Sequence, residues 1–243
     1  MKKEYLSKII IAVTIIITAI ILSSAYINRN KAQNIISVTG MAQEDFVSDL
    51  ITWNASFEVK DMDLTKAYAD LKKTMETVKT TLINKGVNPK EITFSAVDIR
   101  KQYRTVYDEK RNSTSIFDGY RLQQTVSISS HEVDKIEVVS REITELINVG
   151  IEITSYSPEY YYTKLSELKI RMLSDAAKDA NLRATTIAEN GGGKIGKLKV
   201  SSMGVFQITG QNSSEEYSWG GSFNTSSKNK TASITVRFEY ELK

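Results

Sequence analysis

The sequence predicts an α+β protein, with a mainly antiparallel sheet covered by helices on one face. The strand candidates alternate apolar and polar residues, which buries one face of each strand and leaves the other in water. The helix candidates each carry one apolar stripe, recurring every three or four residues. One-sided strands are typical of antiparallel sheets, because parallel sheets are covered on both faces.

Composition restricts the functional classes. The chain has 243 residues and no cysteine, which excludes disulfides, thiolate metal sites and cysteine nucleophiles. Its net charge of +3 comes from the N-terminal segment, where five basic residues oppose one glutamate. The remainder is close to neutral, so its charge gives no indication of nucleic-acid binding, and we expect none.

The N-terminal segment predicts export. Ile9 to Ile27 is nearly all apolar and, as a helix, would be about 28 Å long, close to the thickness of a membrane core. Three lysines precede it, so the positive-inside rule places everything after it outside the cytoplasm. Ser23-Ser24-Ala25 also resembles a signal cleavage site. We therefore expect residues 1–33 to be either a signal-anchor, a transmembrane helix facing the periplasm or cell exterior, or a cleaved signal peptide with a linker, releasing a soluble periplasmic protein.

The first half of the exported part predicts two strand-helix-strand units. A short strand over 35–39 precedes a long alternating strand over 51–59, and Asp63 caps the following helix. The strand over 92–103 changes phase near Ala96-Val97, which indicates a bulge or bend. The remaining features are a polar hairpin tip over 104–115, a return strand over 120–128, a helix with a Ser129–Glu132 capping box that ends at Gly150, and a strand over 151–156.

The second half adds a long helix and two strands. The helix begins near Lys164, its apolar stripe shrinks to alanine midway, and Asn190-Gly191-Gly192-Gly193 ends it. A strand follows over 197–208, then a polar loop over 210–230 that we expect to be mobile or ordered by a partner, and a last alternating strand over 234–242. The order is β-α-β-β-α-β, the ferredoxin-like arrangement, followed by α-β-β.

The glycine-rich segment after the long helix imitates a phosphate-binding loop. Gly191 and Gly196-Lys197 have the spacing of a P-loop, but Leu198 occupies the position of the magnesium-binding Ser or Thr. A P-loop also runs from a strand into a helix, whereas this segment leaves a helix and enters a strand. A helix cap followed by a turn is the better interpretation.

No residue pattern predicts catalysis or a cofactor. His131 is the single histidine, and we expect it to lie exposed near a helix start, away from a nucleophile and an acid. The acidic pairs Glu44-Asp45, Asp108-Glu109 and Glu215-Glu216 lie in expected polar connections. We assign no catalytic, cofactor-binding or metal-binding residue and expect no enzyme, although a carboxylate pair for hydrolysis stays open.

Aromatic residues give the candidates for an interface. Tyr160-Tyr161-Tyr162, with Tyr156 just before, cannot all face one core. Either a partner subunit or a membrane surface covers some of them, or they pack locally over a helix start. Trp219 lies in the polar loop, where no core is expected. These five residues are the predicted interface.

Several short motifs in order resemble the SIMPL-domain family. Ile36–Gly40 is similar to its opening I-x-V-x-G strand, and Gly119-Tyr120-Arg121 to its G-Y-R strand start. Asp175–Ala180 with Ala184, followed by Gly196-Lys197, looks like its helix that leads into G-K. Val47–Asp49 departs from the family pattern, because Ser48 stands where proline is common.

The resemblance implies an exported domain over residues 34–243 without established enzymatic activity. The family includes a periplasmic antigen that forms ring-like homo-oligomers and bacterial members linked to oxidative-stress tolerance. We therefore expect a non-catalytic cell-envelope protein that acts by self-assembly or by binding a partner, with a role in envelope or oxidative-stress tolerance. A ligand-binding or chaperone-like module, with an unknown small molecule or a polypeptide as ligand, and an unrecognised hydrolase are the alternatives.

Overall fold

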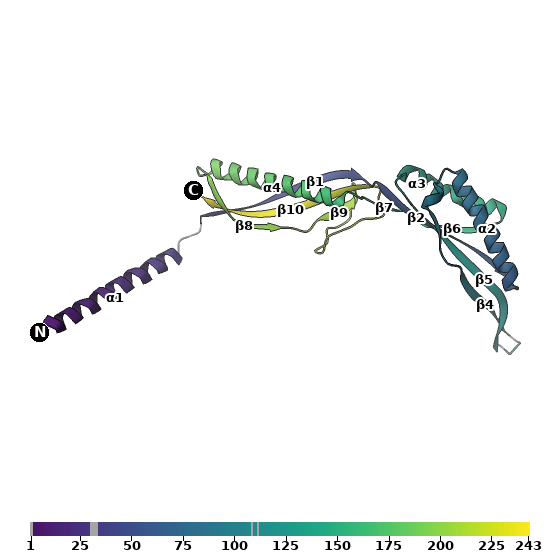
Figure 1. Cartoon of the computed structure of the whole chain (residues 1–243), viewed down its shortest axis with the longest axis horizontal. Helices are drawn as coiled ribbons and strands as arrows, with labels where there is room; N and C mark the ends of the chain where they lie inside the picture. The colour runs from purple at the N-terminus through teal and green to yellow at the C-terminus, as the bar shows by residue number, and fades with distance from the viewer. Residues whose placement is uncertain (1, 30–33, 108, 111) are drawn as a thin grey trace. The chain divides into compact units, whose positions relative to one another are not determined.

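The structure is a computed structural model that describes residues 2–29, 34–107, 109–110 and 112–243, without the side chains of residues 2–10 and 27–29. Within these residues the chain is an α+β protein with four α-helices and ten strands (Figure 1). It divides into two compact units. The first comprises Met1–Gly40, Ala177–Ser202 and Val236–Lys243, and the second comprises Met41–Ala176 and Met203–Thr235.

The second unit contains a six-stranded antiparallel sheet. Its strands follow the order β3-β5-β2-β6, with β4 beside β5 and β7 beside β2. β2, the first strand of this unit in the sequence, lies between β5 and β6. This order is the one expected for two β-α-β units joined by a hairpin. The bounds are β2 (Leu50–Asp61), β3 (Ile92–Phe94), β4 (Asp98–Tyr107), β5 (Ser113–Ser130), β6 (Glu152–Ser155) and β7 (Glu159–Tyr161).

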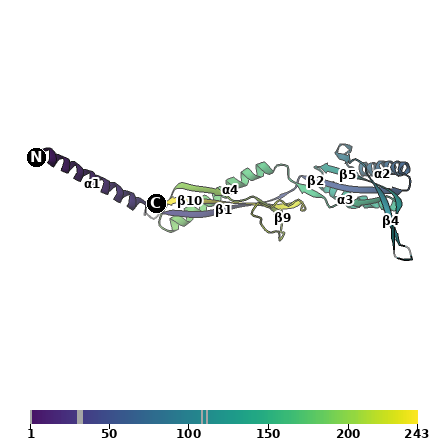
Figure 2. The ribbon, with the colours of Figure 1, turned by 90° about the horizontal axis from the view of Figure 1, so that it is seen from below.

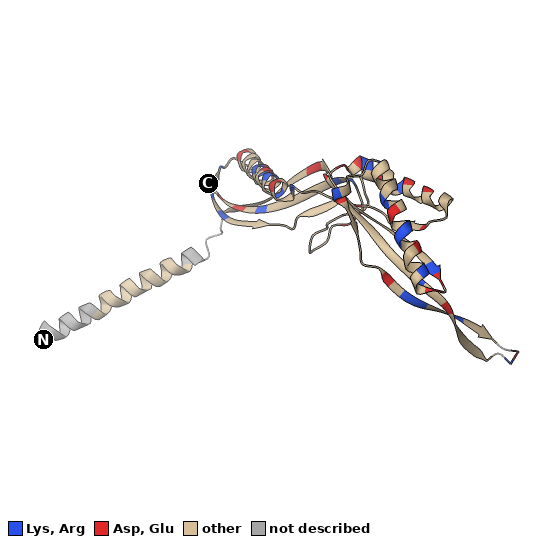
Figure 3. Cartoon of the chain, turned by 45° about the vertical axis from the view of Figure 1, so that its right-hand side comes forward, with Lys and Arg blue, Asp and Glu red and all other residues tan. Residues whose placement is uncertain are grey.

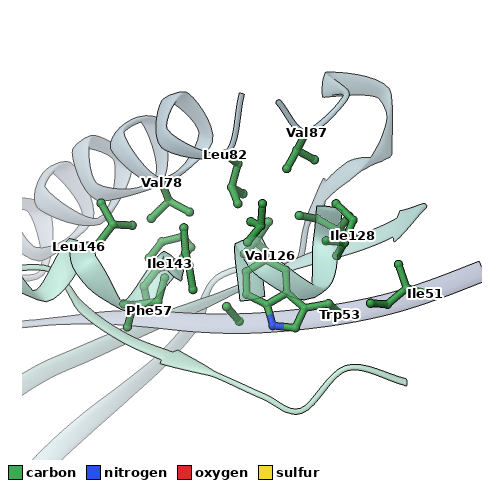
Figure 4. Packing of buried hydrophobic residues seen from close by; sticks show 14 of the residues in the cluster. Ile51, Trp53, Phe57, Val78, Leu82, Val87, Val126, Ile128, Ile143 and Leu146 are labelled. Carbon is green, nitrogen blue, oxygen red and sulfur yellow. The ribbon is translucent and has the colours of Figure 1, made fainter. Parts of the chain in front are cut away.

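Helices cover one face of this sheet, as the sequence predicts. They are α2 (Leu64–Asn84) and α3 (Val133–Glu142), with the 3₁₀ turns η1 (Pro89–Glu91) and η2 (Ile143–Val149). Figure 4 shows Val78 and Leu82 of α2 and Ile143 of η2 directed at Trp53 and Phe57 of β2. These side chains belong to one buried apolar cluster, each large member of which contributes about 1.5–3 kcal/mol when fully buried.

The remaining strands form a second sheet, so the prediction of one sheet is wrong. The order is β1-β10-β8, and β9 also pairs with β10. The chain bends at Asp49, after which β2 pairs with β5 and β6, whereas β1, before the bend, pairs with β10. The strand expected over 35–39 also continues to Val47. The bounds are β1 (Ile35–Val47), β8 (Ile195–Met203), β9 (Gln207–Gly210) and β10 (Asn229–Leu242).

The long helix α4 (Leu165–Asn190) has the expected alanine stripe. In the first unit, Ala180 and Ala184 are fully buried, and Nδ2 of Asn181 donates to the Tyr240 hydroxyl of β10 at 3.1 Å. Figures 1 and 2 show α4 lying along β1 and β10. The helix ends in a glycine cap, because the N–H of Gly193 donates to Ala188 and Gly192 has a φ of +81°.

The N-terminal segment forms the helix α1 (Lys2–Arg29). Among the described residues, however, no helix has the length and apolar character needed to cross a membrane. The transmembrane helix expected over Ile9–Ile27 is therefore not supported. Three of that segment's side chains, and residues 30–33 of the expected linker, lie outside the described residues.

Candidate functional site

The predicted tyrosine interface is divided between core and surface. Tyr160 is 8% exposed and belongs to the buried cluster, and burial raises its pKa. Tyr161 donates its hydroxyl to Glu159 at 2.8 Å, which raises the Tyr161 pKa. The Tyr162 ring packs 4.8 Å from the ring of Phe46. Tyr156 is about half exposed, so it is the member of this group that is most available to a partner. The interface itself stays a prediction.

Trp219 is fully exposed and lines an apolar groove of about 400 Å³. We call this the Trp219 groove; its large apolar lining residues are Met41, Val205, Tyr217, Trp219 and Ile234. Gly204 also lines it, and a Cβ at that position would lie 2.4 Å from Oγ1 of Thr235. Glycine therefore allows the backbone to approach β10 at this point.

The loop that carries Trp219 is held by hydrogen bonds, which the sequence did not predict. Gln207 is buried in β9; its Nε2 donates to the Ser218 carbonyl at 2.7 Å, and its Oε1 accepts from the N–H of Ser222 at 2.7 Å. Glu215 accepts from the N–H of Gly210 at 3.0 Å and from Nδ2 of Asn224. A loop bonded to its own sheet presents Trp219 without needing a partner to order it.

Lys230 adds a buried donor to this hydrogen-bond network. It is 2% exposed, and its Nζ donates to the carbonyl oxygen of Asn224 and, at 3.3 Å, to Oδ1 of the same residue. Burial lowers the Lys230 pKa from 10.5 to about 8, against the opposing charge of Glu215. The amine is engaged with the loop, so its role here is to hold Asn224.

A second pocket, of about 660 Å³ and open to solvent, lies where α3 and α4 begin. We call it the helix-start pocket. Residues of the turn after β1, of the start of α3 and of the start of α4 line it. Nδ1 of His131 is 2.6 Å from the Asp49 carbonyl, and the Asp49 carboxylate accepts two bonds from Thr163. These contacts join segments that are far apart in sequence.

Most charges in the helix-start pocket are paired. Lys135 pairs with Glu132, and Lys228 pairs with Asp134, a hydrogen bond that raises the Lys228 pKa. Among the described residues, the ammonium group of Lys164 has no ion-pair or hydrogen-bond partner. Two charged groups of this pocket therefore have no ion-pair partner among the described residues: the Lys164 ammonium, and the Asp49 carboxylate, which accepts only from the uncharged donors of Thr163.

Ser48 and His131 line the same pocket but do not form a catalytic pair. Ser48 is 4% exposed, and its Oγ makes no hydrogen bond within the described part of the chain. A serine nucleophile needs a base within hydrogen-bond reach, and that base is normally oriented by a carboxylate. Here His131 contacts the backbone carbonyl of Asp49. His131 is exposed, as expected, but the sequence did not predict this pocket.

The expectation that Glu44-Asp45 lies in a polar connection is wrong, because both residues lie in a strand and have side-chain partners. Glu44 and Asp45 lie in β1; Glu44 pairs with Arg171, and Asp45 accepts from Thr231 and Gln211. Asp108 lies outside the described residues. No group of three His, Asp or Glu side chains among the described residues is placed to hold a metal ion. Acidic and basic residues are interspersed along the helices (Figure 3).

Comparison with known proteins gives one match. A family model described as SIMPL, protein of unknown function (DUF541), matches residues 36–240. The match covers both units, the Trp219 groove and the helix-start pocket. No curated protein matches the chain.

Proposed function

The chain belongs to the SIMPL family of proteins of unknown function, and from this premise we propose that it is a non-catalytic binding protein that acts by associating with other copies of itself. The contact surface that we propose is the Trp219 groove, with Tyr156 as a second candidate contact. The cell envelope is its proposed location.

The exposure of Trp219 is the observation that carries this proposal. An indole ring has a large apolar surface, and exposed apolar surface often marks a site of protein–protein contact. Tryptophan is also enriched among the residues that contribute most to binding. The ring is fully exposed, yet the loop beneath it is fastened through Gln207 and Glu215. A pre-ordered aromatic anchor loses little conformational entropy on association, which favours binding.

A second copy is the occupant that suits the groove. The same surface offers an apolar groove and a fully exposed ring, so two copies related by a two-fold axis could each present Trp219 to the other. Such an isologous contact needs no second surface on the molecule.

Sedimentation velocity of the full chain over a concentration series tests the proposal. We expect Trp219→Ala to shift association to higher concentration, by about tenfold or more for the loss of an aromatic anchor. Tyr107→Ala is the control, because Tyr107 is also exposed but lies on the distant part of the β4–β5 hairpin. Equal association of all three proteins would contradict the proposal, since any contribution of α1 is common to them.

Tryptophan fluorescence locates the contact. The chain has two tryptophans, and Trp53 is buried with its indole N–H donating to Ser155 at 3.0 Å. Acrylamide quenching of wild type should therefore report mainly on Trp219, and Trp219→Phe supplies the Trp53 background. Quenching should fall as the protein concentration rises. Quenching that is independent of concentration would place the contact elsewhere.

We further propose that α1 directs export. The three lysines before the apolar segment and the Ser23-Ser24-Ala25 sequence support this proposal. Cell fractionation and mass analysis of the native N-terminus test it. Recovery of the chain from the cytoplasm with an intact N-terminus would contradict it.

A further inference from the structure

The first unit has a groove of about 600 Å³ between the edge of its sheet and α4, which we call the β1–α4 groove. Residues 37–39 of β1 form its strand wall, and its helix wall includes Leu182 and Ile187. Both side chains are aliphatic, yet Leu182 is 65% exposed and Ile187 is 56% exposed. Figures 1 and 2 show α4 running along β1, so an extended strand and a helix lie on the two sides of the groove.

The outer edge of β1 has no strand partner among the described residues, because β1 pairs with β10 on its other side. At the two ends of this pairing, the Asn34 carbonyl accepts at 2.7 Å and the Ser48 N–H donates at 2.9 Å across to the β10 segment. In an antiparallel pair alternate residues face the partner strand, so the even-numbered residues of β1 face β10. The exposure of β1 alternates without a change of phase from Ile36 to Val47. The backbone N–H and C=O groups of residues 37 and 39 therefore point away from β10, where these residues line the groove.

The sequence of β1 does not block the addition of a strand at this edge. Edge strands are commonly protected by charged side chains, prolines or bulges. From Ile35 to Gln43 the strand has no charged residue and no proline. By contrast, β8, at the opposite edge of the same sheet, carries the exposed residues Lys197 and Lys199. Of these two edges, β1 is the one left open to another strand.

The lining of the groove indicates the chemistry of its occupant. Outward backbone groups on a strand edge are satisfied by the backbone of an extended segment, which adds to the sheet. Leu182 and Ile187 would contact one face of that segment, where side chains recur at every second residue. The charged residues that line the groove, Asp179 and Arg183, pair with each other at 2.8 Å. An uncharged segment with alternate aliphatic residues therefore matches the groove.

A second copy of the chain suits the groove less well. Its β8 edge would bring Lys197 and Lys199 to a groove whose acidic lining residue is already paired. On the helix-facing side, its β1 edge would offer Val38, which is already buried, and Gly40, which has no side chain. A segment of a different protein has neither restriction.

We propose that the β1–α4 groove binds an extended, uncharged polypeptide segment of another protein, which adds to the β1 edge as a strand and places alternate aliphatic side chains against Leu182 and Ile187. This binding is separate from self-association at the Trp219 groove, and neither proposal requires the other.

Fluorescence anisotropy of a dye-labelled peptide with the full chain tests the proposal. The probe alternates valine and threonine, with a lysine at each end for solubility. Its counterpart, N-methylated at every valine and threonine, keeps the side chains but lacks the backbone donors. The variants are Leu182→Gln and Thr39→Pro, which removes one outward N–H, a change that edge strands accept. Ile170→Gln is the matched control, because Ile170 is an exposed aliphatic residue of the same helix outside the groove lining.

Amide hydrogen exchange locates the binding. The N–H groups of Ser37 and Thr39 should exchange quickly in the free protein, because they point away from β10, and slowly once a strand is added. Urea unfolding of Thr39→Pro checks that this variant is folded before its binding is measured.

We expect Leu182→Gln to bind the probe about tenfold more weakly than wild type, and Thr39→Pro about threefold or more, since an aliphatic contact and a backbone hydrogen bond are lost. Ile170→Gln should bind as wild type does, and the N-methylated peptide should not bind. No binding of the probe, equal binding of the N-methylated peptide, or equal weakening by Ile170→Gln would overturn the proposal. A change in the sedimentation of the chain alone on Thr39→Pro would assign the β1 edge to contact between copies and would also overturn it.

Discussion

The carboxylate of Asp49 holds both donors of Thr163. Oδ1 accepts the Thr163 N–H at 2.7 Å and Oδ2 accepts its Oγ1 at 2.7 Å, across 114 residues of sequence. Asp49 lies in the bend between β1 and β2, and Thr163 lies two residues before Leu165, where α4 begins. This pair of bonds therefore fixes the geometry from which the helix-start pocket is built.

Asp49→Ala should lower the free energy of unfolding by about 1–3 kcal/mol, because the Thr163 N–H and hydroxyl both lose their acceptor. Asp49→Asn should cost less, since its single carbonyl oxygen keeps one of the two bonds. Urea unfolding gives both values. Asp70→Ala, on the exposed face of α2, is the control and should change stability little. An equal loss in the Asp49 and Asp70 variants would refute the structural role of the pair.

Ser48→Ala should leave stability unchanged or raise it by up to about 1 kcal/mol, because it removes a buried hydroxyl that has no partner among the described residues. Ser155→Ala makes the contrast. Its hydroxyl accepts from the Trp53 indole at 3.0 Å and donates to the Ser140 carbonyl at 2.6 Å. We expect this variant to lose about 1–3 kcal/mol. Thermal unfolding of the two variants side by side checks the sign, and destabilisation by Ser48→Ala would show that its hydroxyl has a partner after all.

Gln207→Ala should release the loop that carries Trp219, because three hydrogen bonds to Ser218 and Ser222 are lost. Chymotrypsin, which cleaves after aromatic residues, reports this directly at Tyr217, Trp219 and Phe223. Cleavage should be faster than in wild type by about tenfold, if local opening becomes easier by roughly 1.4 kcal/mol. Ser214→Ala changes an exposed residue of the same loop and should leave the rate unaltered.

Lys230 should give stability a distinctive pH dependence. Burial lowers its pKa to about 8 in the folded protein, against 10.5 when exposed. Between these pH values the unfolded chain binds more protons than the folded one, so the contribution of Lys230 to stability rises with pH. Relative to Lys230→Met, wild type should gain up to about 3 kcal/mol across this range. Urea unfolding of both proteins at several pH values measures the difference in their free energies of unfolding. The titration of tyrosines is common to both proteins and cancels in this difference. A difference that does not change with pH would contradict the lowered pKa of Lys230.

Local patterns predicted most of the elements. The Asp63 cap is confirmed, with its side chain accepting from the N–H of Lys66 at 2.9 Å, and the phase change near Ala96-Val97 marks the break between β3 and β4. These features depend on a few neighbouring residues, so one sequence is enough to predict them. The Ser129–Glu132 capping box is wrong, because Glu132 pairs with Lys135, a choice between two nearby partners that the motif could not resolve.

The candidate sites were predicted less well. Trp219 was expected to be exposed, and it is, but the buried bonds of Gln207 that hold its loop gave no local signal. Ser48 was noticed only as a departure from a family pattern. Its pocket arises because the turn after β1, the start of α3 and the start of α4 meet in space. Meetings of this kind depend on contacts across more than a hundred residues.

The sequence by itself determined which segments become helices and strands, which face of each is apolar, and the family to which the chain belongs, since periodicity and motif order are local properties. Only the tertiary structure decided that the strands form two sheets, that Tyr160 turns inward while Trp219 stays in water, and that Ser48 and Lys164 share a pocket. The physical reason is that strand pairing and charge pairing are choices among many distant partners. The free energy of the whole fold selects among them.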